Sequence, residues 1–324
     1  MKIFFTDFWA GFDPCDNFIY NALIKHYSLE IDQESPDILF FSCYGSMHMQ
    51  YQCIKVYYTG ENDTPNFTWC DYAMGFDDSL SFGDRYLRLP LYAIQPRFIE
   101  LFGIIRYEDY LSERKFCNYV YSNDRADPIR NLFFHQLNNY KRVDSGGQIE
   151  NNIGGPVKDK LSFISDYKFT IAFENSVYPG YTTEKIVEPM ISRSIPIYYG
   201  NPNVNLDFNP ESFVWVKNAD DIERAIQEII FLDQNKEAYM SRLSAQKVLN
   251  DRYFSLDKLL CEFLGHIFED PLGLSVRRPS YGFSRSFYNQ FVRGEISIEP
   301  LNKNRSRNKV FSFLNKRIKR IVKR

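Results

Sequence analysis

The sequence predicts an α/β protein built on parallel sheets, and three observations support this prediction. Residues 169–200 contain a short apolar segment of strand-forming residues, then a segment with helical spacing, then a second apolar segment. This order indicates a strand–helix–strand unit whose helix begins at Thr182 or Thr183. Residues 2–59 show the same alternation. The chain of 324 residues is also long enough for two domains.

The N-terminal part is expected to form several buried strands and one helix. The helix is predicted over residues 17–27, with Phe18, Leu23 and Ile24 facing inward. The predicted strands are residues 2–8, 38–42 and 56–59.

Glu61 follows the last of these strands, in the segment Tyr-Tyr-Thr-Gly-Glu-Asn at residues 57–62. It therefore lies at the carboxyl end of a strand, where catalytic groups of α/β proteins are usually found. The alternative is an ordinary solvated carboxylate in a loop.

Arg130 is expected near the start of a helix in the second half of the chain. Residues 96–113 have a helical pattern, and we place the crossing between two domains near its end. A strand is predicted at 115–122, and a helix begins near Pro128. The helix macrodipole disfavours a cation in the first turn. A surface arginine beside Asp127 is the alternative interpretation.

Lys185 is a second cation in a predicted first helical turn. A helix N-terminus with an adjacent lysine suits a ligand that carries phosphate. Asn175, Tyr181 and Glu184 provide partners for hydroxyl groups or a nucleoside. The alternative is a polar loop with a threonine cap and a favourably placed Glu184.

The remaining elements continue the α/β pattern. Residues 140–147 are expected to form a turn in which Gly146 and Gly147 adopt conformations that other residues resist. The last predicted helix is expected to pack back on the first domain. After a strand at 209–216, helices are predicted at 219–232, 236–249 and 254–268.

Several of these segments resemble the bacterial α-1,3/4-fucosyltransferases, which are inverting enzymes that use GDP-fucose. The resemblance is carried by FENS, YTTEKI and IPIYYG within residues 173–200, by YTGEN around Glu61, and by DYAMGFDD, DRYLRLPLY and VDSGG. It covers residues 50–260 well and the first 50 residues only by architecture. It implies the GT-B fold, in which two Rossmann-like domains face a cleft.

The resemblance also implies roles for individual residues. Residues 1–111 would bind the acceptor, and residues 112–270 would bind the nucleotide sugar. Glu61 occupies the position of the family's proposed general base, and Arg130 the position of an arginine that meets the diphosphate. Lys185 would share the diphosphate charge, and Glu184 would bind ribose or fucose hydroxyls and balance charge at the anomeric centre. The donor would be positioned by Asn175 and Tyr181.

No metal is expected to take part in donor binding. Asp77 and Asp78 are adjacent, unlike the spaced pair of metal-dependent glycosyltransferases. In this region Arg85, Arg88 and Tyr92 line an acceptor cleft in one interpretation. In the interpretation that we favour, the two arginines brace the loop by pairing with nearby carboxylates. The candidate carboxylates are Asp77, Asp78 and Asp84.

Charge is distributed unevenly along the chain, whose net charge is −2. Residues 301–324 contain ten Lys or Arg and no acid, which leaves 29 basic against 41 acidic side chains in the other 300 residues. Residues 270–300 are expected to be a linker or a loosely packed extension. Residues 309–324 are predicted to form a basic amphipathic helix that lies on an anionic membrane surface. The alternatives are a helix packed on the acidic body and a nucleic-acid tail.

The expected compartment is the cytoplasm, with peripheral attachment to the inner face of the membrane. The six cysteines form no CxxC pair, no signal peptide is visible, and no apolar run approaches the roughly 20 residues that span a bilayer. Zinc binding is therefore not expected.

The sequence thus predicts a glycosyltransferase that moves fucose from GDP-fucose to a glycan, such as N-acetyllactosamine or a lipopolysaccharide side chain, in α-1,3 or α-1,4 linkage. No tightly bound cofactor and no nucleic-acid partner are expected. One alternative is the same fold with a different GDP-sugar donor. A further alternative is a non-catalytic, membrane-attached binder of glycans or nucleotides.

Overall fold

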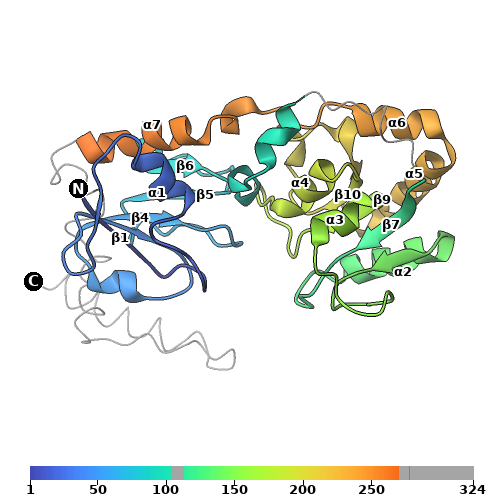
Figure 1. The fold of residues 1–324 in the computed structure, drawn as a ribbon, viewed down its shortest axis with the longest axis horizontal. Helices are drawn as coiled ribbons and strands as arrows, with labels where there is room; N and C mark the ends of the chain where they lie inside the picture. The colour runs from blue at the N-terminus through green and yellow to red at the C-terminus, as the bar shows by residue number, and fades with distance from the viewer. Residues whose placement is uncertain (104–112, 270–276, 278–324) are drawn as a thin grey trace, which may run out of the picture. The chain divides into compact units, whose positions relative to one another are not determined.

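The computed structural model describes residues 1–103, 113–269 and 277, and it contains two parallel β-sheets (Figure 1). The expected domain boundary between residues 111 and 112 lies outside the described residues. The same holds for the helix expected at 309–324 and, except for Arg277, for the linker that precedes it.

The first sheet has the strand order β2-β1-β3-β4-β5-β6, and every neighbouring pair is parallel. The strands expected near residues 2–8, 38–42 and 56–59 are confirmed as β1, β3 and β4. The bounds are β1 (Lys2–Thr6), β2 (Glu30–Ile31), β3 (Ile38–Phe41), β4 (Ile54–Tyr58), β5 (Tyr72–Gly75) and β6 (Tyr86–Arg88).

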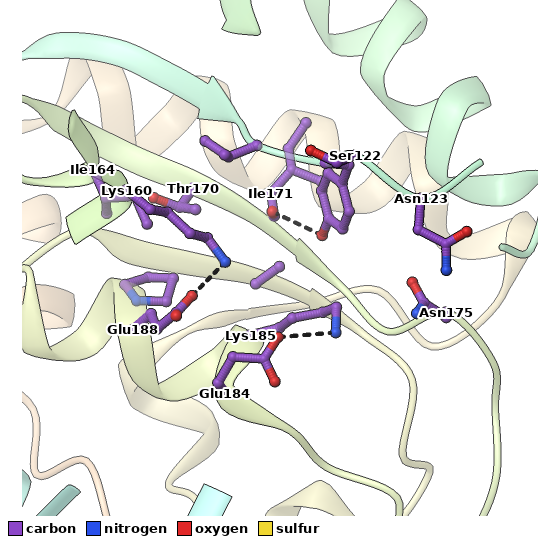
Figure 2. A pocket seen from close by; sticks show the side chains of 14 residues that line it. Ser122, Asn123, Lys160, Ile164, Thr170, Ile171, Asn175, Glu184, Lys185 and Glu188 are labelled. Carbon is purple, nitrogen blue, oxygen red and sulfur yellow. Dashed lines mark hydrogen bonds and ion pairs between the residues drawn. The ribbon is translucent and has the colours of Figure 1, made fainter. Parts of the chain in front are cut away.

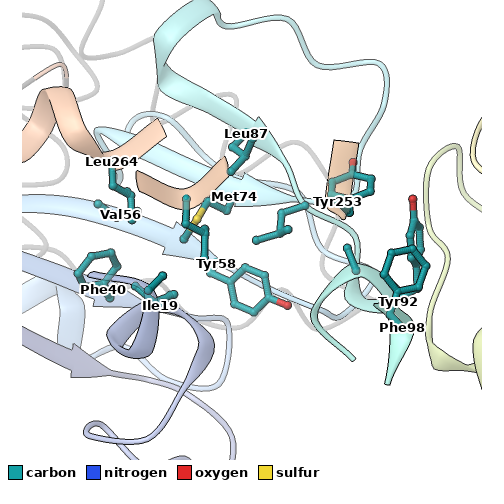
Figure 3. Packing of buried hydrophobic residues seen from close by; sticks show 14 of the residues in the cluster. Ile19, Phe40, Val56, Tyr58, Met74, Leu87, Tyr92, Phe98, Tyr253 and Leu264 are labelled. Atoms are coloured by element: carbon teal, nitrogen blue, oxygen red, sulfur yellow. The ribbon is translucent and has the colours of Figure 1, made fainter. Parts of the chain in front are cut away.

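Two helices that are far apart in the sequence pack together in the core of the first sheet. These are α1 (Phe18–Leu23), which Asn17 caps, and α7 (Leu256–Glu269). The prediction that Ile24 faces inward is wrong, because α1 ends at Leu23 and leaves Ile24 as a 48% exposed C-cap residue. Figure 3 shows Leu264 of α7 near Val56 and Met74 of the sheet.

Short 3₁₀ segments supply the other turns around the first sheet. Of the helix expected over residues 96–113, the described part forms only one such segment, η4. The segments are η1 (Met47–Gln50), η2 (Gly83–Arg85), η3 (Leu91–Ile94) and η4 (Phe98–Phe102).

The second sheet has the order β11-β10-β9-β7-β8 and is also parallel. The strand–helix–strand unit predicted over residues 169–200 is confirmed as β9, α4 and β10. The strands are β7 (Lys115–Tyr119), β8 (Val143–Ser145), β9 (Tyr167–Phe173), β10 (Ile195–Tyr199) and β11 (Val214–Trp215). The α-helices are α2 (Ile129–Tyr140), α3 (Lys160–Ser165), α4 (Glu184–Ile191), α5 (Ile222–Gln234) and α6 (Lys236–Ser244).

The turn expected over residues 140–147 is corrected by the structure. Residues 143–145 form the edge strand β8, which pairs with β7. Neither glycine that follows has a positive φ. Gly147 is instead required by close packing, because an added Cβ would lie 2.0 Å from the carbonyl oxygen of Tyr121.

The interpretation of Arg85, Arg88 and Tyr92 is also corrected. Arg85 donates to backbone carbonyls, including that of Asp71 at 2.8 Å. Arg88 forms a two-bond pair with Asp207, which follows η6 (Val204–Leu206), at 2.9 and 2.6 Å. Tyr92 is fully buried and so cannot line an open cleft. The pairing that braces this region is therefore with a carboxylate more than one hundred residues away.

The largest hydrophobic cluster contains residues from the neighbourhood of both sheets. Its members include Val56 of β4 and Leu264 of α7, and also Ile186 of α4 and Tyr198 of β10. A bilayer-spanning helix would need a long and nearly uncharged apolar stretch, and no helix in the described part of the chain has one.

The substitution Arg88→Met is expected to lower the free energy of unfolding by about 3–5 kcal/mol, because it leaves the Asp207 carboxylate buried without its charge partner. Arg97→Met is the matched control. It removes an arginine from the half-exposed Arg97–Glu100 pair and should cost less than about 1 kcal/mol. Urea unfolding measures both losses, and equal losses would contradict this account of the Arg88–Asp207 pair.

Candidate active site

A buried carboxylate organises the start of α4. Glu174 follows β9 directly and is fully buried. Its carboxylate accepts hydrogen bonds from the backbone N–H and the hydroxyl of Thr183, at 2.8 and 2.7 Å. Thr183 is the N-cap of α4, and its side chain accepts from the N–H of Lys185. Glu174 thus fixes the residue from which the helix starts.

Gly200 is needed beside this carboxylate. Its φ is +153°, and an added Cβ would lie 2.4 Å from Cγ of Glu174. A side chain at this position would therefore be strained and would displace Glu174.

Lys185 lies in the first turn of α4, as expected, and nearby acids compensate for the unfavourable helix dipole. Its Nζ lies 3.2 Å from Oε1 of Glu184 and 3.5 Å from Oε2 of Glu174. Although burial opposes it, the negative charges of Glu174 and Glu184 raise the pKa of Lys185. Lys185 therefore stays positively charged. One reason for a cation at this position is structural, because it compensates the buried charge of Glu174.

Arg130 also lies in a first helical turn, that of α2, and its side chain is buried. Its guanidinium lies over the ring of Tyr121, 4.4 Å from the centroid. It donates to the carbonyl oxygen of Asn123 at 2.6 Å and to Oδ1 of Asn175 at 3.4 Å. The alternative of a surface arginine beside Asp127 is therefore wrong.

A cavity of about 330 Å³ lies between α3, α4, β9 and the loop that follows β7 (Figure 2). Asn175, Glu184 and Lys185 line it, as do Tyr121 and Asn123. Arg130 is not among the lining residues, but it contacts three that are. The structure thus brings both helix-start cations to the wall of one cavity.

Lys185 and Arg130 both influence the pKa of Tyr121, which lines this cavity. Burial raises the pKa of Tyr121, and the positive charges of Lys185 and Arg130 oppose that rise. The hydroxyl oxygen of Tyr121 lies 3.0 Å from the carbonyl oxygens of Ile171 and Phe173, so its single proton is shared between these two acceptors. Tyr121 is therefore fixed to β9 while its ring supports the guanidinium.

The other end of the cavity contains an ion pair that the sequence analysis missed. Lys160 of α3 pairs with Glu188 of α4 (Figure 2). Burial raises the pKa of Glu188, against the effect of Lys160. Burial also acts on Glu184, but Lys185 and Lys160 outweigh it and lower the pKa of Glu184. Helical spacing places Glu188 one turn after Glu184, whereas nothing in the sequence connects Lys160 with them.

Tyr181 lies outside the lining of this cavity. It is buried edge-on against Phe76, which follows β5 of the first sheet, at a ring distance of 5.1 Å. Burial raises the pKa of Tyr181, and the charges of Glu174 and Glu61 add to the rise. Tyr181 is thus within electrostatic reach of both carboxylates.

Glu61 lies in the loop after β4, as predicted, and is exposed. Its Oε1 accepts a hydrogen bond from the hydroxyl of Tyr44 at 2.7 Å. The next residue, Asn62, donates to Oγ of Ser176 at 2.8 Å. Since Ser176 follows Asn175, the loop that carries Glu61 contacts the loop that forms part of the cavity.

No group of three or more His, Cys, Asp or Glu side chains is arranged to hold a metal ion within residues 1–103, 113–269 and 277. The positive charges around the cavity come from Arg130, Lys160 and Lys185.

Two family models match the chain. The α-(1,3)-fucosyltransferase FucT N-terminal domain matches residues 3–95, and the C-terminal part of glycosyltransferase family 10 (fucosyltransferase) matches residues 111–263. Among curated proteins, the α-(1,3)-fucosyltransferase FucT of Helicobacter pylori is 36% identical over 278 residues. That match covers 72% of this chain.

The chain spans only part of the curated relatives that it matches. The matched part is 58% of the length of the Helicobacter pylori protein. It is 30% of the length of a putative fucosyltransferase of a mimivirus and 44% of that of a bovine fucosyltransferase.

Solved structures match over more of their length. A crystal structure of an α1,3-fucosyltransferase with GDP has a TM-score of 0.71 and 33% identity, and the match covers 86% of this chain and 92% of that one. A structure with GDP-fucose has a TM-score of 0.68 and 33% identity, over 83% and 90% of the two chains. The predicted GT-B fold class is thereby confirmed.

The substitution Lys185→Met is expected to destabilise the fold more at pH 8 than at pH 5, by a difference on the order of 1–3 kcal/mol. Burial already raises the pKa of Glu174, and loss of the lysine would raise it further. A carboxyl group with a raised pKa in the folded state adds stability at low pH, and this is lost as the pH rises through that pKa. Urea unfolding at the two pH values measures the difference.

The double variant Glu174→Gln/Lys185→Met is the matched control, because it lacks the carboxyl group that titrates. Its own free energy of unfolding should therefore change less between pH 5 and pH 8 than that of the single variant. If the single variant lost the same amount at both values, the charge coupling between Lys185 and Glu174 would be refuted.

Proposed function

Because the chain belongs to glycosyltransferase family 10, the fucosyltransferases, we propose that it transfers fucose from GDP-fucose to a hydroxyl group of a glycan, with inversion at the anomeric carbon. The observation that carries this proposal is the cavity at the start of α4, whose wall is supported by Arg130 and Lys185. The α1,3-fucosyltransferase structures with GDP and GDP-fucose support the choice of donor.

The diphosphate would lie at the end of the cavity formed by Lys185, Asn175 and Asn123. Lys185 lines the cavity and would contact phosphate oxygens directly. Arg130 lies behind the wall, bonded to both asparagines, so it would stabilise the diphosphate by short-range charge and by orienting Asn175. These fixed charges would stabilise the leaving group as negative charge develops on it. They would serve without a bound metal ion.

Glu184 and Tyr181 would bind the sugars of the donor. Glu184 lines the cavity and is about one quarter exposed, and its lowered pKa keeps it ionised at neutral pH. It would accept hydrogen bonds from ribose or fucose hydroxyls and balance positive charge at the anomeric carbon. Tyr181 would position the donor at the side nearer Glu61.

Glu61 would act as the general base. Tyr44 holds one of its carboxylate oxygens, and the other has no hydrogen-bond partner among the described residues. As the acceptor oxygen bonds to the anomeric carbon, the bond from that carbon to the diphosphate oxygen would break. The hydroxyl proton would pass to Glu61.

The acceptor would be a glycan such as N-acetyllactosamine or a lipopolysaccharide side chain, linked α-1,3 or α-1,4. The main alternative is another GDP-sugar as donor, because no residue pattern identifies the part of the site that reads the sugar. A non-catalytic binder is less favoured, because binding alone requires no exposed carboxylate beside the cavity loop.

The substitution Glu61→Gln is expected to lower the rate of fucose transfer by about 10²–10⁴-fold, because it removes the proton acceptor. The affinity for GDP should stay close to wild type, since Glu61 does not line the donor cavity. Product formation from GDP-fucose and calorimetric titration with GDP measure the two effects.

Glu223→Gln makes the same chemical change at an exposed position of α5 and is the control. Unchanged transfer by Glu61→Gln would show that another group is the base. Parallel assays of the wild type with GDP-mannose and UDP-galactose test the donor. Turnover with one of these sugars but not with GDP-fucose would reject the fucosyltransferase proposal.

We also propose, from the sequence, that residues 309–324 attach the protein to the cytoplasmic face of an anionic membrane. Six Lys or Arg lie after residue 315 in this segment. Each basic group near an anionic surface contributes about 1 kcal/mol to membrane binding.

Truncation after Pro300 is expected to abolish sedimentation with anionic lipid vesicles and to retain transfer to soluble acceptors. The chain of 324 residues with neutral vesicles is the control, and it should stay largely in the supernatant if the attraction is electrostatic. A truncated protein that still sediments with anionic vesicles would refute the role of this segment.

A further inference from the structure

A second cavity, of about 310 Å³, lies on the first sheet and has no part in the donor site described above. Phe40 and Val56 belong to the main core, whereas their neighbours Phe41 and Tyr57 belong to a small separate cluster. Successive strand residues point to opposite faces of a sheet. The cavity, which Phe41 and Tyr57 line, therefore lies on the face opposite α1 and α7.

One wall of this cavity contains a buried histidine–carboxylate pair. Nδ1 of His48 lies 2.7 Å from Oδ2 of Asp7, and the two side chains are 7% and 3% exposed. Asp7 has a φ of +58°, and its carboxylate also accepts from the backbone N–H groups of Met47 and His48, at 3.0 and 2.8 Å. The imidazole is stacked on Phe41, with ring centroids 4.2 Å apart. The orientation of the His48 ring is thus fixed by its contact with the Asp7 carboxylate and by stacking on Phe41.

This arrangement leaves Nε2 of His48 available to a ligand. Within the described part of the chain, Nε2 has no hydrogen-bond partner, although His48 lines the cavity. Because the Asp7 carboxylate can only accept, Nδ1 is the nitrogen that donates to it, and Nε2 of an imidazole with this single proton is an acceptor. A pre-oriented acceptor in a cavity wall is a feature of binding sites for small polar ligands.

Other lining residues of this cavity add hydrogen-bonding groups and an aromatic ring. Asp63 accepts from the hydroxyl of Tyr57 at 2.6 Å, and it lines the cavity together with Asn66. Trp69 is half-buried, and its ring centroid lies 6.0 Å from that of His48. No lysine or arginine is among the described residues that line this cavity, in contrast to the donor cavity. The chemistry suits a neutral ligand with several hydroxyl groups and an apolar face.

The second cavity shares its loops with Glu61. Tyr44, which holds the Glu61 carboxylate, lies between the lining residues Cys43 and Gly45. On the other side, the N–H of Asp63 donates to the carbonyl oxygen of Glu61 at 2.7 Å. A ligand in this cavity would therefore lie beside the group assigned as the base.

We propose that this cavity is a subsite for one neutral pyranose unit of the acceptor glycan, next to the unit whose hydroxyl group is fucosylated. The inference rests on the proposed function, since it takes the acceptor to be a glycan that reacts at Glu61. Nε2 of His48 and the carboxylate of Asp63 accept hydrogen bonds from the ring hydroxyls, and Trp69 contacts the apolar face of the ring. The subsite thereby favours oligosaccharide acceptors over single sugars.

The test compares transfer to N-acetyllactosamine with transfer to N-acetylglucosamine, as the ratio of the two kcat/KM values. His48→Asn keeps a donor for Asp7 but removes the Nε2 acceptor, and Asp63→Asn keeps an acceptor for Tyr57 but removes the charge. Each variant is expected to lower the ratio by about fivefold to tenfold, the effect of one lost hydrogen bond. His26→Asn, at an exposed position on a different surface, is the matched control and should leave the ratio unchanged.

Equal losses on the two acceptors, or an unchanged ratio in both variants, would overturn the subsite while leaving the transferase proposal intact. If the wild type transfers fucose to neither acceptor, saturation-transfer NMR with N-acetyllactosamine decides the question without turnover. Binding that weakens in both variants but not in His26→Asn would support the subsite even though the proposed function had failed. Absence of binding would overturn the subsite.

Discussion

The contact between the Glu174 carboxylate and Thr183 is the constraint on which the rest of the site depends. It joins the end of β9 to the start of α4 with two short hydrogen bonds in a region that water does not reach. A buried carboxylate needs a compensating charge, and Lys185 supplies it. The cation is thereby fixed at the helix start, at the wall of the cavity.

This arrangement also explains how a site rich in acids can receive an anionic donor. Glu184 and Glu188 are each paired with a lysine, so the cavity does not present an excess of negative charge. Arg130 adds a positive charge that no carboxylate neutralises in the described residues, because its partners are an amide, a carbonyl group and an aromatic ring. In the proposed reaction this charge is preorganised, so little reorganisation is required when the diphosphate leaves.

The sequence predicted the features that depend on neighbouring residues. Strand composition and helical spacing located β9, α4 and β10, and with them the shared position of Asn175, Glu184 and Lys185. It could not predict contacts that only the folded chain creates. Lys160 meets Glu188 from another helix, Arg88 pairs with Asp207 across 119 positions, and Gly147 is required by the backbone of Tyr121. Ile24 was misplaced because the periodic pattern continues through it and does not show that the helix ends at Leu23.

The body of α4 has a consequence that reaches beyond its charged first turn. Ile186, Val187 and Met190 are buried in the same hydrophobic cluster as Tyr92 and Phe98, and α4 contacts η3 and η4 of the N-terminal part. The helix that carries Lys185 therefore packs against elements of the N-terminal part as well as against the second sheet. Heating such a molecule should produce a single calorimetric transition, and a nucleotide that binds at α4 should delay the melting of β1 to β6 as much as that of β7 to β11.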